Sequence, residues 1–178
     1  MTESPTELQP ATERYGFADH HCFACGTTNP IGMRLQIALG DGTATTEWKP
    51  GPDFVGWSDR VHGGLLAAVL DEVMAWAPSS DDAWAVTSRF TVRFHSPASP
   101  GELLNATGWV EGKRRRIYTT RGEIRALDGR LVAEAEGTYV GASPSQKAEL
   151  KKRYGIRPTA TNTTQTTEPS GLMEASER

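Results

Sequence analysis

One stretch of the chain decides its interpretation: His62-Gly-Gly-Leu-Leu-Ala-Ala-Val-Leu-Asp-Glu-Val-Met-Ala-Trp-Ala77. From Gly64 onward the turn residues disappear, and Pro78 follows, so the stretch predicts a helix that ends before the proline. Apart from Asp71 and Glu72, no side chain on this helix is polar. A helix that is apolar nearly all round belongs inside a domain or at an oligomer interface.

The helix has one large-residue side and one small-residue side, because successive residues are rotated by about 100°. The large side consists of Leu66, Val69, Leu70, Val73, Met74 and Trp76. Asp71 lies on the small side with Gly64, Ala67, Ala68 and Ala75. A carboxylate in such surroundings is costly unless it is hydrogen-bonded, paired or protonated. Asp71 is therefore a candidate reacting group; the alternative is an ion pair with an arginine at a subunit interface.

The start of the helix offers a second functional feature. Unpaired N–H groups at Gly63 and Gly64, together with the positive end of the helix dipole, favour an oxyanion. Asp71 follows about two turns later, roughly 10 Å along the axis. A donor and a carboxylate that flank one pocket suit acyl transfer to water. Glu72 points about 100° away from Asp71, which favours a rim or interface residue over the alternative that it is the base.

The rest of the domain is predicted to be mostly strand. Residues 35–39 and 43–48 flank Asp41-Gly42, which is typical of a hairpin turn. After the helix come four strand-like runs, 84–95, 102–111, 115–127 and 130–140, separated by turn sequences. In 84–95 apolar and polar residues alternate except at Ser88, so one face should be buried. This order predicts an α+β domain with one helix packed on one curved antiparallel sheet. Residues 144–154 are predicted to form a short surface helix.

The ends of the chain differ from the domain in composition. Residues 1–15 and 157–178 are polar and poor in large apolar groups, so both are predicted to be disordered and the working domain to span 16–156. The net charge of −3 argues against nucleic acid and anionic membranes as partners. No secretory signal and no run of roughly 20 apolar residues is present, so we expect a soluble, cytoplasmic protein.

The two cysteines, Cys22 and Cys25, are too few for a secreted disulfide framework. With His20 and His21 they superficially offer metal ligands. No second pair of Cys or His follows at a finger-like spacing, so the sequence favours structural packing and predicts no metal site.

Three features together resemble a known family. These are His62-Gly63-Gly64, Asp71 nine residues after the histidine, and Cys22-Phe-Ala-Cys-Gly-Thr-Thr-Asn-Pro-Ile-Gly32. Over about residues 20–142 the chain resembles the hot-dog thioesterases of the phenylacetate-pathway (PaaI-like) type, which hydrolyse acyl-CoA thioesters. The resemblance implies a curved antiparallel sheet wrapped around one long central helix. It also implies a medium-chain or aromatic acyl-CoA substrate, no cofactor apart from the CoA of that substrate, and a homodimer or homotetramer with sites between subunits.

The resemblance also assigns roles to residues. The N–H of Gly63 would polarise the thioester carbonyl, and Asp71 would act as general base or as nucleophile, a choice that stays open. Thr87 would hold the water, and His62 would orient the loop or the substrate. One position departs from the pattern: some relatives have an Asn six residues before the histidine that binds the substrate carbonyl, and this chain has Gly56 there.

The one dense basic run, Lys113-Arg114-Arg115-Arg116, lies at a predicted turn. Guanidinium groups match phosphate geometry, and the family places nucleotide contacts there. We therefore expect Lys113, Arg114 and Arg115, with Gly64, to contact CoA; the alternative is a solvated turn. Two other functions stay open: a non-catalytic acyl-CoA-binding or regulatory protein, motivated by Gly56, and a hot-dog dehydratase, which is less favoured because His62 leads directly into Gly-Gly.

Overall fold

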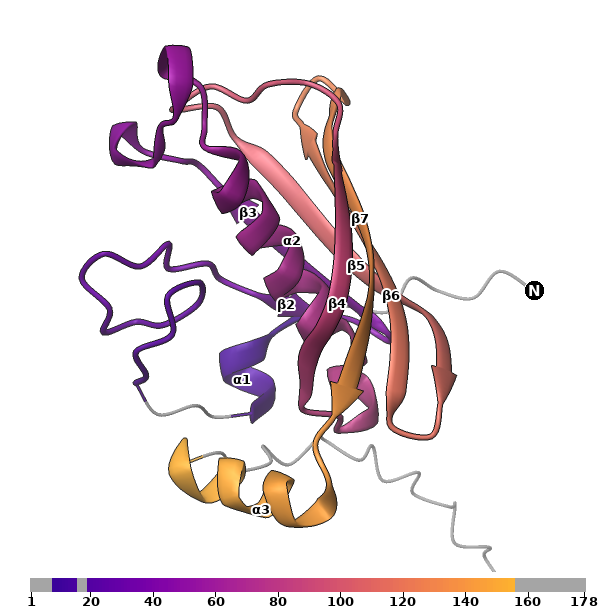
Figure 1. Ribbon diagram of the computed structural model, residues 1–178. Coiled ribbons are helices and arrows are strands. Elements are labelled where there is room, and N and C mark those ends of the chain that lie inside the picture. Colours follow the sequence, from indigo (N-terminus) through magenta and orange to yellow (C-terminus); the bar gives the residue numbers. More distant parts are fainter. Residues whose placement is uncertain (1–7, 16–18, 156–178) are drawn as a thin grey trace, which may run out of the picture.

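The computed structural model describes residues 8–15 and 19–155. Seven strands form one sheet in the order β1-β2-β3-β5-β6-β7-β4, and every neighbouring pair is antiparallel. Figure 1 shows this curved sheet with the long helix α2 lying along one face. The predicted α+β class, with one central helix on a curved antiparallel sheet, is confirmed.

The strands are β1 (Gln9–Pro10), β2 (Ala38–Leu39), β3 (Thr43–Trp48), β4 (Ala85–Phe94), β5 (Leu104–Arg114), β6 (Ile117–Ala126) and β7 (Leu131–Gly141). The α-helices are α1 (Ala11–Tyr15), α2 (Gly63–Trp76) and α3 (Pro144–Arg153). Short 3-10 helices are η1 (Pro52–Phe54), η2 (Trp57–Asp59) and η3 (Ala77–Asp81).

Helix α2 forms the centre of the core, as its apolar composition predicts. Its large side is buried against the sheet, through Leu66, Val69, Leu70, Val73 and Met74. Two glycines permit this close approach. A Cβ on Gly108 would lie 2.6 Å from the carbonyl carbon of Val73, and one on Gly122 would lie 2.9 Å from Cγ of Met74. Gly108 and Gly122 pair directly across β5 and β6, so together they make the depression into which the helix fits.

Two turns lie where the sequence predicts them, and a third lies elsewhere. Gly42 (φ +63°) and Gly129 (φ +85°) adopt the left-handed conformation in the predicted Asp-Gly turns. The predicted break at 111–113 is wrong, because β5 continues to Arg114 and the turn lies at residues 115–116. Arg115 takes the positive φ there (+58°), and Gly112 lies at a register shift inside the ladder instead.

Strand β4 is the free edge of the sheet, since it pairs with β7 alone. The lapse in alternation at Ser88 coincides with a register shift between Thr87 and Arg89. The apolar face of β4 is less buried than the alternation predicts: Val86 is 67% exposed and Phe94 53% exposed in the single chain. A row of apolar side chains on a free edge indicates a surface for another strand.

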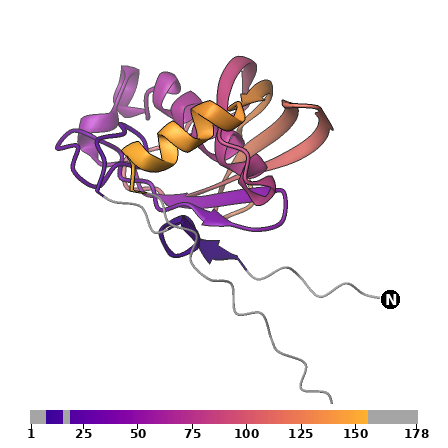
Figure 2. The same cartoon turned by 90° about the horizontal axis from the view of Figure 1, so that it is seen from below.

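The two ends of the described chain are also structured. The predicted disorder is wrong for residues 9–15, which form β1 and α1 with Ala11 and Tyr15 buried; residues 1–7 and the tail 157–178 lie outside the described residues. At the C-terminal end of the described chain, the predicted surface helix is confirmed as α3. It begins with a capping box between Ser143 and Gln146. Figure 2 shows α3 lying across one end of the molecule. No helix within 8–15 and 19–155 combines the length and apolar character needed to cross a membrane.

The contact between α2 and the sheet is testable by adding a single methyl group. We predict that Gly108→Ala lowers the free energy of unfolding by about 1–3 kcal/mol or more, because its Cβ meets the backbone of α2 and overpacking has this cost. Gly112→Ala is the matched control, since a Cβ there meets nothing within 4 Å. Urea denaturation measures both variants. Equal stability of the two would contradict the packing described here.

Candidate functional site

Asp71 is held by two hydroxyl donors. Oγ1 of Thr87 donates a hydrogen bond of 2.6 Å to Oδ1 of Asp71, and the phenol of Tyr139 donates one of 2.9 Å to the same oxygen. Among the described residues, no lysine or arginine forms an ion pair with Asp71, and no donor reaches its Oδ2. The arginine pair considered from the sequence would join two subunits, and that alternative stays untested in the single chain; among the described residues, Oδ2 of Asp71 is left for a ligand.

Tyr139 is a site residue that the sequence interpretation missed. It lies on β7 directly opposite Thr87 and is fully buried. Burial, followed by the negative charge of Asp71, raises the pKa of Tyr139 well above its ordinary value, so the phenol stays protonated and donates. The signal that could have identified it is the pairing of the strands that contain Thr87 and Tyr139, which a single sequence does not give.

The start of α2 is capped by His62. Nδ1 of His62 accepts the N–H of Gly64 at 3.0 Å, and the carbonyl of His62 accepts the N–H groups of Leu65 and Leu66. The N–H of Gly63, in contrast, has no acceptor among the described residues. Gly63 thus presents the free donor that the sequence predicts, whereas the N–H of Gly64 is already used. His62 thus caps this helix end, and its predicted role in orienting the loop or the substrate stays a prediction.

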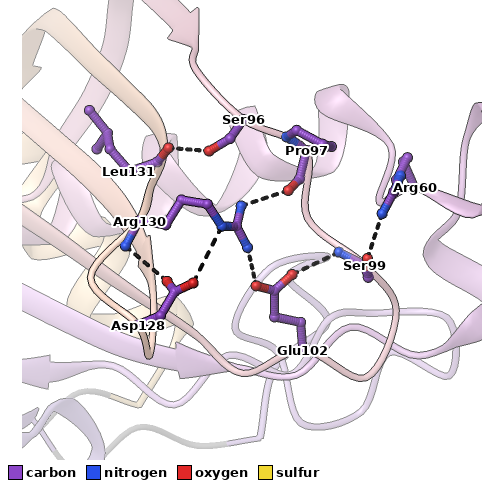
Figure 3. Close-up of polar contacts among 8 residues, drawn as sticks. All are labelled: Arg60, Ser96, Pro97, Ser99, Glu102, Asp128, Arg130 and Leu131. Carbon is purple, nitrogen blue, oxygen red and sulfur yellow. Dashed lines mark hydrogen bonds and ion pairs between the residues drawn. The ribbon is translucent and has the colours of Figure 1, made fainter.

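The segment before His62 is anchored to the β4–β5 connection. Nη1 of Arg60 donates to Oγ of Ser99 at 2.8 Å, and the N–H of Val61 donates to the carbonyl of Ala98 at 3.0 Å. Figure 3 shows the polar contacts that fix this β4–β5 connection in place. Oε2 of Glu102 accepts the N–H of Ser99 at 2.9 Å.

Arg130 is the centre of the network in Figure 3. Its guanidinium group donates to the carbonyl of Pro97 at 2.7 Å, pairs with Glu102, and lies 3.7 Å from Oδ2 of Asp128. Ser96 donates to the carbonyl of Leu131 on β7. Through these contacts the β6–β7 turn fixes the loop that supports the start of α2.

The departure at Gly56 has a steric consequence. A Cβ at this position would lie 3.3 Å from Cδ2 of His62 and 3.4 Å from its Cα. An Asn side chain would therefore require the His62 ring or backbone to move. The chain thus has no side-chain amide at this point, and Gly63 remains the available donor for a carbonyl.

Gly63 and Asp71 of one chain are too far apart to act on the same bond. Eight residues of helix separate them, a rise of about 12 Å. A reacting carbonyl must lie about 3 Å from both its donor and its attacking group. The single chain therefore carries the donor and the carboxylate as two half-sites at different places along α2, and the pocket that the sequence predicts to join a donor to a carboxylate stays a prediction.

The predicted basic contacts lie away from Asp71. Nζ of Lys113 pairs with Oδ2 of Asp81 at 2.8 Å and lies 5.3 Å from the ring centroid of Tyr118. Lys113, Tyr118, Tyr139 and Thr87 occupy one row across the sheet, so three strand spacings, about 14 Å, separate Lys113 from Thr87. The side chains of Arg114 and Arg115 are exposed at the turn. Their contact with CoA, and that of Gly64, stay predictions.

A second cluster lies on the other side of the same helix turn. The ligating atoms of Cys22, Cys25 and Glu72 lie within 4.8 Å of one another, and Oε1 of Glu72 accepts the indole N–H of Trp76 at 2.9 Å. Hydrogen bonds from the Cys25 thiol and from the backbone N–H groups of Cys25 and Ala24 lower the pKa of Cys22 to about 5. Burial raises the pKa of Glu72. Glu72 therefore faces this loop and lines the cavity next to it, and this position does not support a role as the base beside Thr87.

The comparisons with known proteins agree with this fold. Residues 59–133 match the family model described as Thioesterase superfamily, a segment that includes His62, Asp71 and Thr87. A curated relative, an uncharacterised protein of Schizosaccharomyces pombe, is 32% identical over 103 residues, which cover 53% of this chain. The chain thus spans 57% of the length of that relative.

Two solved structures illustrate the structural likeness. A putative thioesterase of Ralstonia eutropha, described as phenylacetic acid degradation-related, is 28% identical with a TM-score of 0.55, over 61% of this chain and 85% of that one. A hypothetical thioesterase of Streptococcus pneumoniae, solved with coenzyme A, is 19% identical with a TM-score of 0.58, over 61% of this chain and 86% of that one. Both structures confirm the hot-dog fold, and the family match together with the Ralstonia eutropha structure confirms the resemblance to thioesterases of the phenylacetate-pathway type.

Proposed function

We propose that this protein is an acyl-CoA thioesterase that hydrolyses a medium-chain or aromatic acyl-CoA to the free acid and CoA. The observation that carries the proposal is the Asp71 carboxylate, which is held by Thr87 and Tyr139 and paired with no described cation. The Thioesterase superfamily match over residues 59–133 supports the reaction class. The coenzyme A in the similar Streptococcus pneumoniae structure supports the kind of ligand.

The reaction uses the two oxygens of Asp71 differently. Thr87 and Tyr139 hold Oδ1, so in this proposal Oδ2 is the oxygen that meets the substrate. As general base, Oδ2 takes a proton from water while the water oxygen attacks the thioester carbonyl carbon. The oxyanion that forms accepts the N–H of a Gly63, the C–S bond breaks, and the CoA thiolate leaves and is protonated. Alternatively Oδ2 attacks the carbonyl carbon itself: the C–S bond breaks and CoA leaves, and water then hydrolyses the mixed anhydride on Asp71, which gives the same free acid and CoA.

The donor for the oxyanion comes from a second subunit in this proposal. Asp71 contacts Thr87 near one end of β4, and Gly63 lies next to Phe94 at the other end. A two-fold antiparallel pairing of two β4 edges, centred between residues 90 and 91, sets Thr87 opposite Phe94 of the partner subunit. That arrangement brings Gly63 of the partner subunit toward Asp71. It also covers Val86 and Phe94, which are exposed in the single chain.

The CoA part of the substrate is proposed to meet the basic hairpin end formed by Lys113, Arg114 and Arg115. Lys113 has its side chain on the same face of the sheet as Tyr139, because directly paired residues share a face. Phosphate groups could displace Asp81 from Lys113 at this exposed position. Gly64 would permit close approach of the ligand to the helix start.

A first prediction tests Asp71 directly. We expect Asp71→Asn to lower kcat by about 100- to 10,000-fold, since a general base contributes this much, while the fold and oligomer persist. Glu149→Gln, the same change on the exposed face of α3, should leave turnover intact. A panel of acyl-CoA esters with a thiol reagent measures CoA release. Unchanged turnover in Asp71→Asn would refute the mechanism. If the wild type binds acyl-CoA without hydrolysing it, the protein is instead a non-catalytic acyl-CoA-binding protein, the alternative that Gly56 motivates.

A second prediction tests whether the site is shared between subunits. Gly63→Pro removes the N–H donor with little harm to the helix, because proline is favoured at the first helical position and His62 already has the extended conformation that precedes proline. We expect Gly63→Pro and Asp71→Asn to be almost inactive alone. Mixed after reversible dissociation, they should regain about a quarter of the wild-type rate, since half of the dimers are mixed and each has one intact site.

The control for this mixing experiment is a mixture of each variant with itself, treated identically. Recovery confined to the mixture of the two different variants supports a site made by two chains. No recovery, with mixed dimers demonstrated by mass spectrometry, would contradict it.

A further inference from the structure

The Cys22-Cys25-Glu72 cluster is built from two segments that are far apart in the sequence. Two sulfurs come from the loop after α1, and the carboxylate comes from α2, one residue after Asp71. Their ligating atoms lie within 4.8 Å of one another. A tetrahedral zinc ion with bonds of 2.3 Å to sulfur and about 2.1 Å to oxygen places its ligands about 3.6–3.8 Å apart. A contraction of about 1 Å or less would therefore bring all three onto one ion.

The loop conformation presents both sulfurs to the same side. The N–H of Gly26 donates to the carbonyl of Cys22 at 3.0 Å, which closes the turn. A Cβ at position 26 would lie 2.4 Å from both the nitrogen and the carbonyl oxygen of Cys22, so only glycine fits.

Glu72 is oriented as a ligand would be. The indole of Trp76 fixes its Oε1 at 2.9 Å, in the way that an outer hydrogen bond holds a metal-binding carboxylate. No lysine or arginine among the described residues forms an ion pair with Glu72. Three groups that can each become an anion thus converge at one point, and a bound cation would be stabilised by all three.

We propose that Cys22, Cys25 and Glu72 form a site for one divalent thiophilic ion, with Zn²⁺ as the ion that this ligand set prefers. Thiolate ligands disfavour Mg²⁺ and Ca²⁺, which take oxygen ligands. The fourth coordination position faces a cavity of about 630 Å³ lined by His20, His21 and Trp84, and it is taken by a water molecule. The ion ties the loop after α1 to the helix turn that carries Asp71, so it stabilises the loop independently of the hydrolysis proposed above.

The test uses the full chain, purified without a histidine tag under reducing conditions and stripped of metal with a chelator. Competition with a chromophoric chelator should give one Zn²⁺ per chain, and Co²⁺ should give a thiolate-to-cobalt charge-transfer band. Cys25→Ser and Glu72→Gln should each weaken Zn²⁺ binding by at least about 100-fold, because even an outer partner is worth 10- to 100-fold. Asp71→Asn, the neighbouring carboxylate, should bind Zn²⁺ as the wild type does.

Two outcomes would overturn the proposal: a Co²⁺ complex without the charge-transfer band, or equal Zn²⁺ affinity in the wild type and Cys25→Ser. A disulfide between Cys22 and Cys25 that persists under the reducing conditions would also overturn it. Should Cys25→Ser fail to fold, the exposed Cys22→Ser serves as the second variant. A rise in the thermal midpoint on adding Zn²⁺, present in the wild type and absent from Cys22→Ser, would support the site.

Discussion

The close packing of α2 on the sheet at Gly108 and Gly122 is the constraint on which the rest of the structure depends. Because no side chain separates helix from strands there, Val73 and Met74 rest almost on the β5 and β6 backbone. At that depth, Asp71 accepts hydrogen bonds from Thr87 on β4 and Tyr139 on β7. The next residue, Glu72, points about 100° away and lies close to Cys22 and Cys25 in the loop after α1. The two polar residues of an otherwise apolar helix thus serve two different places.

The fold was largely predictable from the sequence, because hydrophobic patterns and turn residues report it locally. The apolar stretch before Pro78 predicts α2, and the Asp-Gly pairs predict their hairpins. The β5–β6 turn was misplaced because Gly112 signals a break, whereas the chain turns at Arg115, a residue without turn preference. Strand β1 and helix α1 were missed because they are held in place by contacts that are distant in the sequence, those of Tyr15 with Trp76 and Trp84.

The candidate site was predictable only where its residues follow one another along the chain. Asp71 and the free N–H of Gly63 could be inferred from helix periodicity and helix-end chemistry. Tyr139 lies 68 positions from Asp71, and only the register of β4 against β7 brings it there. The meeting of Glu72 with the two cysteines is equally a property of the tertiary structure. Spacing along the chain predicts no metal site, whereas the folded structure brings three candidate metal ligands together.

The half-sites on α2 relate chemistry to assembly. The network around Arg130 and Ser99 holds the helix start, with its free donor, at one end of β4. Thr87 and Tyr139 hold the carboxylate at the other end. In the proposed dimer, pairing of two β4 edges would bury apolar surface such as Val86 and Phe94 and bring a donor to a carboxylate in the same step.

The most direct test is a crystal structure of the protein with a non-hydrolysable ketone analogue of an acyl-CoA, in which a CH2 group replaces the thioester sulfur. The ketone oxygen should lie about 3 Å from the N–H of Gly63 of the partner subunit, with Oδ2 of Asp71 within about 3.5 Å of the carbonyl carbon or one water away from it. A ligand bound elsewhere, or a carbonyl that contacts neither group, would contradict the account.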